Sequence, residues 1–226
     1  MNSIVGIEGL YPTIKIIKFT KKIAIANKES IICGWNLIQK ELKKNKTKFI
    51  PVDSEHFSMW YGLQNLSTQS LEKLFITASG GPLYRLPLKS FKNIKVSQAL
   101  KHPNWKMGKK ISIDSSTLMN KVLEHIEAQK LFQIPSKKLE ILIHPESLVH
   151  AIVKFKNGLI KFIYHDTSMI IPIANAIFEN DLEIENFLTK KTKIKNLTFK
   201  TPSKNNFPII SVLNKVNEHP STSIII

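Results

Sequence analysis

The sequence predicts a mixed fold, in which an α/β segment is followed by an α+β domain with an exposed sheet. Near the N-terminus, short apolar runs at residues 4–5 and 23–26 flank a helix-like stretch at residues 11–19. That order predicts a strand, a helix and a second strand. Further along, apolar runs at residues 148–155 and 159–164 flank an Asn-Gly pair, which tolerates the positive φ of a hairpin turn.

The remaining elements follow from the spacing of apolar residues. Strands are predicted at residues 49–52, 74–77 and 139–143, where short apolar runs end at polar or turn-forming residues. Helices are predicted at residues 117–129 and 171–178, where apolar side chains recur three and four positions apart. Long loops connect these elements.

The N-terminal segment is typical of a doubly wound nucleotide-binding sheet. Such sheets open on a glycine-rich turn that holds a phosphate at the start of a helix. We find no such turn in the 226 residues. The expectation is therefore a Rossmann-like domain of which the first half is missing.

Composition predicts a globular protein of the cytoplasm. A chain of 226 residues with 42% hydrophobic content can bury one sizeable core or two small ones. The single cysteine, Cys33, cannot form an internal disulfide and is predicted to be a buried small hydrophobe. The sequence has no apolar stretch of the roughly 18 residues that a membrane span needs, so no membrane association is expected.

The formal charge of +16 raises the alternative of a nucleic-acid partner. Arg85 is the only arginine among the 33 basic residues, whereas nucleic-acid readers favour arginine for bidentate contacts. The lysines are spread along the chain, and residues 190–195 are one example. Nucleic-acid binding is therefore a weak alternative.

Two carboxylates follow the predicted strand at residues 49–52. Asp53 and Glu55 lie two positions apart, so they share one side if the strand geometry continues. Carboxylate oxygens suit Mg²⁺ or Mn²⁺. The alternative is that Asp53 caps the next helix and that Glu55 completes the cap. A metal site needs a third carboxylate from elsewhere.

Two loops have the composition of ligand-binding segments. Residues 79–82, Ser-Gly-Gly-Pro, follow a predicted strand, and the glycines let backbone N–H groups approach an anion. An ordinary tight turn explains them equally well. Residues 102–108 combine Trp105, a lysine and a glycine and suggest a lid over a ligand; half-buried loop packing is the alternative.

The helix predicted at residues 117–129 has two different faces. Its apolar positions are predicted to face the core, and they are Leu118, Met119, Val122, Leu123 and Ile126. Asn120, Lys121 and Glu124 share the other side close to Ser115 and the helix start, where an anion is stabilised. Glu124 is the candidate third carboxylate; the alternative is a solvated helix face.

Together these segments resemble the 1-deoxy-D-xylulose 5-phosphate reductoisomerase family from about residue 2 to the end of the chain. The matching segments are Asn27-Lys28-Glu29-Ser30, Pro51-Val52-Asp53-Ser54-Glu55-His56, Ser79-Gly80-Gly81-Pro82, residues 101–108, Lys110 to Asp114 with Ser115, Asn120-Lys121, Glu124, and His144-Pro145 with Ser147. The matches occur in the same order as in the family.

The resemblance implies roles for individual residues. It implies that the metal ligands, for Mn²⁺ or Mg²⁺, are Asp53, Glu55 and Glu124, which together with Lys28 are the implied catalytic residues. The implied substrate contacts are Lys28, Ser54, Glu55, Ser79, His102, Ser115, Asn120, Lys121 and Glu124. The implied NADPH contacts are Asn27, Glu29, Gly108, Trp105, Met107 and Met169.

The resemblance also implies a reaction and a domain organisation. The reaction is a metal-assisted rearrangement of a small phosphosugar, 1-deoxy-D-xylulose 5-phosphate, and its reduction by NADPH to 2-C-methyl-D-erythritol 4-phosphate in the non-mevalonate isoprenoid pathway; the family implies a homodimer. Residues 1–48 are expected to be the partial dinucleotide-binding domain, residues 49–180 the catalytic domain, and residues 181–226 a linker toward a C-terminal helical domain that this chain lacks. The alternative is a catalytically incomplete fragment of that enzyme.

Overall fold

The computed structural model describes residues 1–178, 183–188 and 196–216. Its α-helices are α1 (Leu10–Ile17), α2 (Lys28–Asn45), α3 (Ser54–Leu63), α4 (Val96–Ala99), α5 (Lys109–Thr117), α6 (Met119–Phe132), α7 (Ile170–Phe178) and α8 (Val212–Val216). Its strands are β1 (Lys22–Ile25), β2 (Lys48–Pro51), β3 (Leu71–Ala78), β4 (Leu139–Ile143), β5 (Val149–Phe155) and β6 (Ile160–Tyr164). Short 3₁₀ helices span Ile7–Gly9, Thr68–Ser70, Leu88–Asn93, Ser136–Lys138, Ile184–Phe187 and Pro208–Ser211. The predicted mixed α/β class is confirmed.

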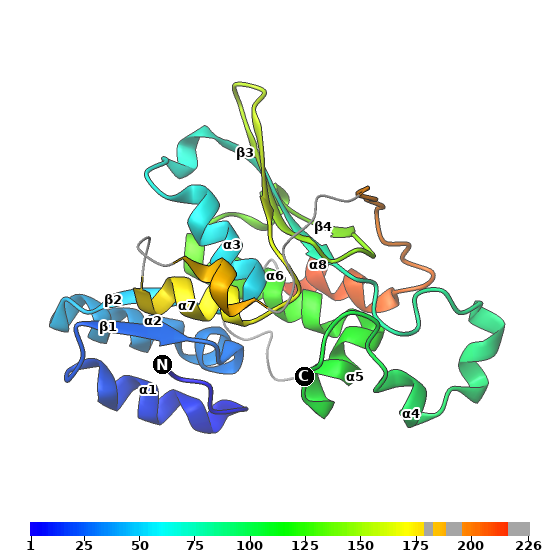
Figure 1. Ribbon diagram of the computed structural model, residues 1–226, viewed down its shortest axis with the longest axis horizontal. Helices are drawn as coiled ribbons and strands as arrows, with labels where there is room; N and C mark the ends of the chain where they lie inside the picture. The colour runs from blue at the N-terminus through cyan, green and yellow to red at the C-terminus, as the bar shows by residue number, and fades with distance from the viewer. Residues whose placement is uncertain (179–182, 189–195, 217–226) are drawn as a thin grey trace.

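The N-terminal unit is a parallel pair of strands packed with two helices (Figure 1). β1 pairs with β2 in a register that places Ile23 opposite Phe49. The helix side chains Ile17, Ile31, Trp35, Ile38 and Leu42 join Ile23 and Ile25 in one buried cluster. The parallel pair directs the carboxyl ends of both strands to the same edge, where the polar residues 27–29 and 53–55 follow.

The strand expected at residues 4–5 is not formed. Val5 is 72% exposed, and only Asn2 makes an isolated parallel bridge, with Ile25. Asn2 N–H donates to the Ala24 carbonyl at 2.8 Å, and the Asn2 side chain donates to the Gly9 carbonyl at 3.2 Å. These bonds fix a single residue beside β1, and the chain then turns away at Gly6, whose φ is +79°.

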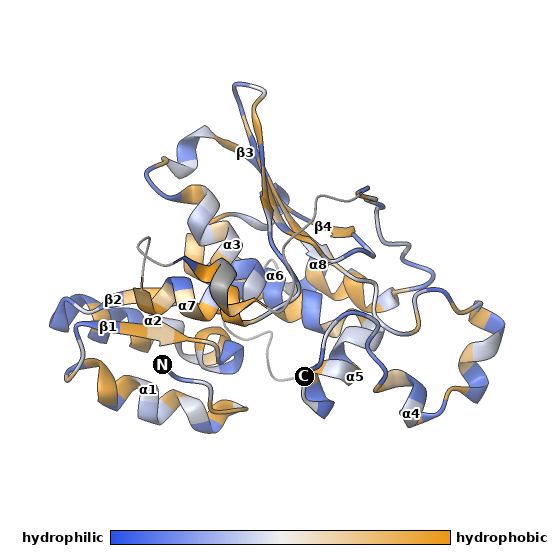
Figure 2. Cartoon of the chain, in the orientation of Figure 1, coloured by the Kyte–Doolittle hydropathy of each residue, from blue (hydrophilic) through white to orange (hydrophobic). Residues whose placement is uncertain are grey.

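The second sheet is mixed and has the order β4-β3-β5-β6. β3 pairs in parallel with β4 and antiparallel with β5, and β5 and β6 form the predicted hairpin, whose turn contains Gly158 with φ +85°. The strands predicted at residues 49–52, 74–77 and 139–143 are present as β2, β3 and β4. Figure 2 shows apolar colour along these strands, and α3 and α6 pack against the sheet.

Two helices replace the single helix predicted at residues 117–129. α5 ends at Thr117 and α6 begins at Met119, because Leu118 between them adopts a left-handed conformation with φ +65°. The sequence analysis missed α5. As predicted, Leu118, Val122 and Ile126 are buried in the core.

The C-terminal part contributes to the core where it is described. α7 is close to the helix predicted at residues 171–178. Phe207 and Leu213 pack into the cluster that contains Ile143, and Lys200 bridges to Ile143. The lysine-rich segment at 190–195 and the final run at 222–226 lie outside the described residues, and the predicted division at residue 181 remains a prediction.

The exposure of the single cysteine differs from the prediction. Cys33 is exposed, so the expectation of a buried cysteine was wrong; it lies on the side of α2 away from the buried Ile31 and Ile38. Among the described residues, no helix has the length and apolar character needed to cross a membrane.

Candidate functional site

A cavity of about 270 Å³ lies at the carboxyl ends of β1, β2 and β3 and is closed by α5 and α6. In open α/β folds, ligands bind in the crevice beyond the carboxyl ends of the strands. The predicted site residues that line the cavity are Asn27, Lys28, Glu29, Asp53, Ser54, Glu55, Ser79, His102, Trp105, Met107, Ser115, Asn120, Lys121, Glu124 and Met169. Gly108 is not among the lining residues; it precedes α5 as its N-terminal cap residue.

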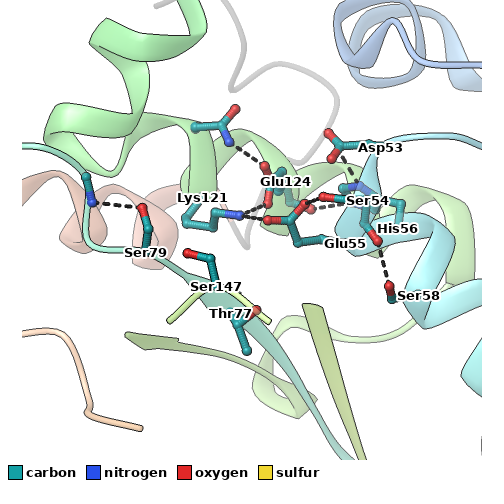
Figure 3. A network of polar contacts seen from close by, with 12 residues as sticks. Asp53, Ser54, Glu55, His56, Ser58, Thr77, Ser79, Lys121, Glu124 and Ser147 are labelled. Carbon is teal, nitrogen blue, oxygen red and sulfur yellow. Dashed lines mark hydrogen bonds and ion pairs between the residues drawn. The ribbon is translucent and has the colours of Figure 1, made fainter. Parts of the chain in front are cut away.

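Three carboxylates meet in this cavity. Oxygen atoms of Asp53, Glu55 and Glu124 lie within 4.8 Å of one another. Asp53 and Glu55 follow β2, whereas Glu124 comes from the second turn of α6 (Figure 3). Asp53 occupies the cap position of α3, but its side chain makes no capping hydrogen bond, so the alternative of a helix cap is wrong for Asp53.

Two ammonium groups lie among the carboxylates. Lys28 Nζ is 2.8 Å from Asp53 Oδ2 and donates to Glu124 Oε1 at 3.2 Å. Lys121 Nζ donates to Glu124 Oε2 at 2.5 Å and also to Glu55 (Figure 3). Asn120 accepts from Lys28 Nζ at 2.7 Å and donates to Glu124. The polar side of α6 is therefore buried, and the alternative of a solvated helix face was wrong.

The charges in this group perturb one another. Burial disfavours the charged form of Glu55, but Lys121 outweighs it and the pKa of Glu55 falls below its ordinary value. Burial, with the neighbouring Glu55, raises the pKa of Glu124 to about 7. Burial alone would lower the pKa of Lys28, yet Asp53 and Glu124 raise it well above its ordinary value. Three acids share two ammonium groups, and Glu124, only 1% exposed, takes up a proton more readily than Glu55.

This arrangement has the chemistry of a divalent cation site. Carboxylate oxygens are the ligands that Mg²⁺ and Mn²⁺ prefer. Asp53 and Glu55 lie at the start of α3 and Glu124 lies in α6, and these two helices pack together, so the fold brings the ligands close before any ion binds. The same donor set is a poor match for soft, thiolate-binding metals, because Cys33 lies on the outer side of α2.

The sequence analysis missed a buried pair, His56 and Glu127, that lies next to Glu124. His56 Nε2 lies 2.9 Å from the Glu124 carbonyl oxygen, and His56 Nδ1 lies 3.4 Å from Glu127 Oε2. Burial lowers the pKa of His56 to about 4 and raises that of Glu127. Glu127 lies three residues after Glu124, so the same helix spacing that selected Glu124 could have indicated it.

The glycine turn after β3 packs closely against α5. Gly81 has φ +73°, and a Cβ atom there would lie 2.3 Å from the Ser115 carbonyl oxygen. The turn therefore needs glycine, and it brings Ser79 and Ser115 to the same wall of the cavity. Ser79 Oγ accepts from the Gly81 N–H at 3.0 Å and lies 2.9 Å from His102 Nε2.

The loop at residues 102–108 is held by its own histidine. His102 Nδ1 accepts from the backbone N–H groups of Asn104 and Trp105, at 3.2 and 2.9 Å. The neutral ring therefore carries its proton on Nε2, which donates to Ser79 Oγ. Asn104 Nδ2 donates to Ser147 Oγ at 2.8 Å. These bonds place Trp105 on the cavity wall, edge-on to His150.

All residues with an implied NADPH role except Gly108 belong to the lining of the cavity. Asn27, Glu29, Trp105, Met107 and Met169 line the cavity. The Asn27 side chain is engaged within the protein, since its Oδ1 accepts from the Ser30 N–H at 2.6 Å and its Nδ2 donates to the Gly6 carbonyl at 2.8 Å. The Asn27 side chain is therefore held in the cavity wall by hydrogen bonds within the protein.

Two family models match this chain. Residues 49–132 match the 1-deoxy-D-xylulose 5-phosphate reductoisomerase C-terminal domain, and residues 1–34 match the 1-deoxy-D-xylulose 5-phosphate reductoisomerase model. These matches include Asp53, Glu55, Glu124 and both site lysines.

Similar proteins carry the same name. A 1-deoxy-D-xylulose 5-phosphate reductoisomerase of Pelagibacter ubique is 58% identical over 229 residues, covering 98% of this chain and 57% of the relative. One from Wolbachia pipientis subsp. Culex pipiens is 45% identical over 228 residues, covering 99% of this chain and 58% of the relative. This chain thus spans somewhat more than half the length of these relatives.

Solved structures agree with the sequence relatives. A DOX-P reductoisomerase in complex with NADPH, fosmidomycin and magnesium superimposes with a TM-score of 0.86 at 33% identity, covering 96% of this chain and 56% of that chain. The Zymomonas mobilis enzyme in complex with NADPH gives a TM-score of 0.81 at 31% identity, with coverages of 96% and 56%. The chain belongs to the 1-deoxy-D-xylulose 5-phosphate reductoisomerase family.

Proposed function

We propose that this chain provides the metal- and substrate-binding site of a 1-deoxy-D-xylulose 5-phosphate reductoisomerase. The reaction rearranges 1-deoxy-D-xylulose 5-phosphate and reduces the product to 2-C-methyl-D-erythritol 4-phosphate in the non-mevalonate isoprenoid pathway. The observation that carries this proposal is the meeting of three carboxylates and two lysines in one cavity. The family membership supports the same reaction.

Asp53, Glu55 and Glu124 are the proposed ligands of Mg²⁺ or Mn²⁺. The proximity of their oxygen atoms, within 4.8 Å, supports this assignment. When bound, the cation polarises the carbonyl and the adjacent hydroxyl of the substrate. A solved relative is named as a complex with magnesium.

The chain's own side chains would bind and orient the two ends of the substrate. Ser79, His102, Ser115, Asn120 and Lys121 are the proposed contacts, chiefly to the phosphate; the contact of the Ser79 turn with α5 supports a common binding wall. Lys28 and Ser54 are the proposed contacts near the reacting oxygens. Holding both ends of a small flexible substrate lowers the entropic cost of reaching the reactive geometry.

NADPH would lie along the wall that carries Asn27, Glu29, Met107, Trp105 and Met169, with Gly108 at the start of α5. Bound there, it supplies the hydride for the reduction. The Trp105 loop would exclude water from the reacting centre, and the bonds of His102 and Asn104 support a defined position for this loop.

The domain division is part of the proposal. Residues 1–48 would be the closing part of a Rossmann-like NADPH domain, residues 49–180 the catalytic domain, and residues 181–226 a linker toward the family's C-terminal helical domain. The parallel order of β1 and β2 supports the first assignment. A cytoplasmic location remains a prediction from the single cysteine.

A homodimer is the proposed assembly. β6 is an edge strand of its sheet, and Leu159 and Ile160 beside this edge are exposed. Exposed apolar edge strands are suited to pairing with a second chain. Sedimentation equilibrium distinguishes a dimer from a monomer, and a monomer at all concentrations would contradict this part of the proposal.

The test of the proposed function is NADPH oxidation with 1-deoxy-D-xylulose 5-phosphate and Mn²⁺. We expect Glu124→Gln to lose turnover by at least about 100-fold, because a ligand of the reacting centre is removed. Glu140→Gln, which changes an exposed acid paired with Lys73, is the matched control and should leave turnover unchanged.

Each outcome of this assay is informative. Turnover that depends on Glu124 supports the reductoisomerase. A folded chain that binds Mn²⁺ without turnover supports the alternative of a catalytically incomplete fragment. Turnover that is equal in Glu124→Gln and wild type would contradict the assigned site.

A further inference from the structure

The three carboxylates already have cationic partners within the protein. Lys28 Nζ contacts Asp53 and Glu124, and Lys121 Nζ contacts Glu55 and Glu124. Every proposed ligand of the divalent ion is therefore in an ion pair, and Glu124 is in two. The side chains of both lysines are less than one-tenth exposed, so solvent screens these contacts only weakly.

A divalent ion held by all three acids would lie close to both ammonium groups. The lysines donate to both oxygens of Glu124, to Oε1 from Lys28 and to Oε2 from Lys121, and Lys28 Nζ also lies 2.8 Å from Asp53 Oδ2. An ion held by Glu124 must therefore share an oxygen that already accepts from a lysine. Charges of the same sign at such separations, partly removed from water, repel strongly. The ion and the ammonium groups therefore compete for the same oxygens.

We propose that Lys28 and Lys121 are built-in competitors of the divalent cation, and that metal binding displaces their ammonium groups from the acids toward the cavity. Both lysines line this cavity, so the displaced groups would face a bound anion. The inference rests on the proposed function, because it takes the three acids as the ligands of the ion. It adds that the cation and an anionic ligand favour each other's binding through the two lysines.

The charge count of the site supports this coupling. Three carboxylates and two ammonium groups nearly balance, with one negative charge in excess when all are ionised. Adding a divalent ion leaves one positive charge in excess, which an anionic ligand offsets.

The competition is tested by the affinity of the full chain for Mn²⁺, measured by titration calorimetry without substrate. We expect Lys28→Met and Lys121→Met each to bind Mn²⁺ at least about tenfold more tightly than wild type, because one competing charge is removed. Lys110→Met is the control for a general charge effect: Lys110 lines the same cavity but pairs with Glu29 and Asp114. We expect it to change the affinity by less than about threefold.

Thermal unfolding provides a second measurement that does not depend on turnover. Lys28→Met removes the lysine partner of Asp53 and one of the two lysine partners of Glu124, so it should unfold at a lower temperature than wild type without Mn²⁺. Saturating Mn²⁺ should raise its unfolding midpoint more than that of wild type, because the variant binds the ion more tightly. If one variant does not fold, the other carries the same test.

The outcomes separate this inference from the proposed function. Mn²⁺ binding by wild type with equal or weaker binding by both lysine variants overturns the competition alone. An equal gain in affinity in Lys110→Met also overturns it, because the effect would then come from net charge. Absence of Mn²⁺ binding in all of the proteins overturns the metal assignment and this inference together.

Discussion

The affinity of the site for Mn²⁺ should rise with pH between about pH 6 and pH 8. Burial, with the neighbouring Glu55, raises the pKa of Glu124 to about 7, and a carboxyl group must lose its proton before it can bind a metal. At pH 6 most Glu124 side chains are protonated, so binding must release that proton. At pH 8 most are already ionised and binding releases almost none.

The magnitude follows from this pKa. A single group that titrates near pH 7 should make the affinity about tenfold weaker at pH 6 than at pH 8, which corresponds to about 1.4 kcal/mol. Binding should release about 0.9 proton at pH 6 and about 0.1 at pH 8. Lys121 keeps Glu55 ionised across this interval, so Glu55 adds little to the dependence.

Titration calorimetry in two buffers of different ionisation enthalpy measures both the affinity and the protons released. Glu124→Gln should weaken binding at both pH values and remove the proton release. Glu127→Gln is the matched control, because Glu127 is also buried with a raised pKa but is not one of the three proposed ligands. Equal affinity of wild type at pH 6 and pH 8, without proton release, would refute the reasoning.

Two further predictions concern stability in urea. Gly81→Ala should lower the free energy of unfolding by more than about 2 kcal/mol, because residue 81 has a left-handed conformation and the added Cβ would meet the Ser115 carbonyl. Gly158→Ala should lower it by only about 1 kcal/mol, because Gly158 also has a positive φ, +85°, but has open space around it. Equal losses would show that the contact with α5 is unimportant. Burial lowers the pKa of His125 to about 4, so between about pH 6.5 and pH 4 the unfolded chain binds a proton at His125 that the folded protein does not. The free energy of unfolding should therefore fall by up to about 3 kcal/mol as the pH drops through this interval. His125→Gln should remove this part of the slope, and an unchanged slope would count against it.

Strands were the most predictable part of the fold. β4 matches the predicted residues 139–143, and the hairpin of β5 and β6 surrounds Gly158 as expected. Short apolar runs between turn-forming residues allow few alternatives. The failure at the N-terminus has a different cause: Ile4 and Val5 have the composition of a strand but do not pair with one, because in this segment only Asn2 bridges to β1.

Helices with polar or alternating sequences were less predictable. In α5, Ile111 and Ile113 alternate with polar residues as in a strand, and tertiary packing against α6 decides the helix instead. In α6, the charges of Lys121 and Glu124 suggested a choice between a site and a solvated face. Only the tertiary structure shows that both side chains are buried, with Glu124 paired with Lys28 of α2 and Lys121 paired with Glu55 of α3.

The site residues that directly follow a strand were predictable. The buried residues that contact the site residues from the protein interior were not. Asp53 and Glu55 follow β2, so the sequence pattern indicates them. His56 Nδ1 and Glu127 Oε2 lie 3.4 Å apart on the far side of Glu124 from the cavity; the helix spacing from Glu124 could have indicated Glu127, but no sequence pattern pairs it with His56. Their pairing depends on the packing of α3 against α6.

The most direct test of the central claim is anomalous X-ray diffraction from crystals of the chain grown with Mn²⁺. We predict a manganese peak in the cavity, bonded to carboxylate oxygens of Asp53, Glu55 and Glu124, with the ammonium groups of Lys28 and Lys121 turned away from those oxygens. A cavity without a manganese peak, at an ion concentration that saturates binding in solution, would contradict the assignment of these three acids as the metal site.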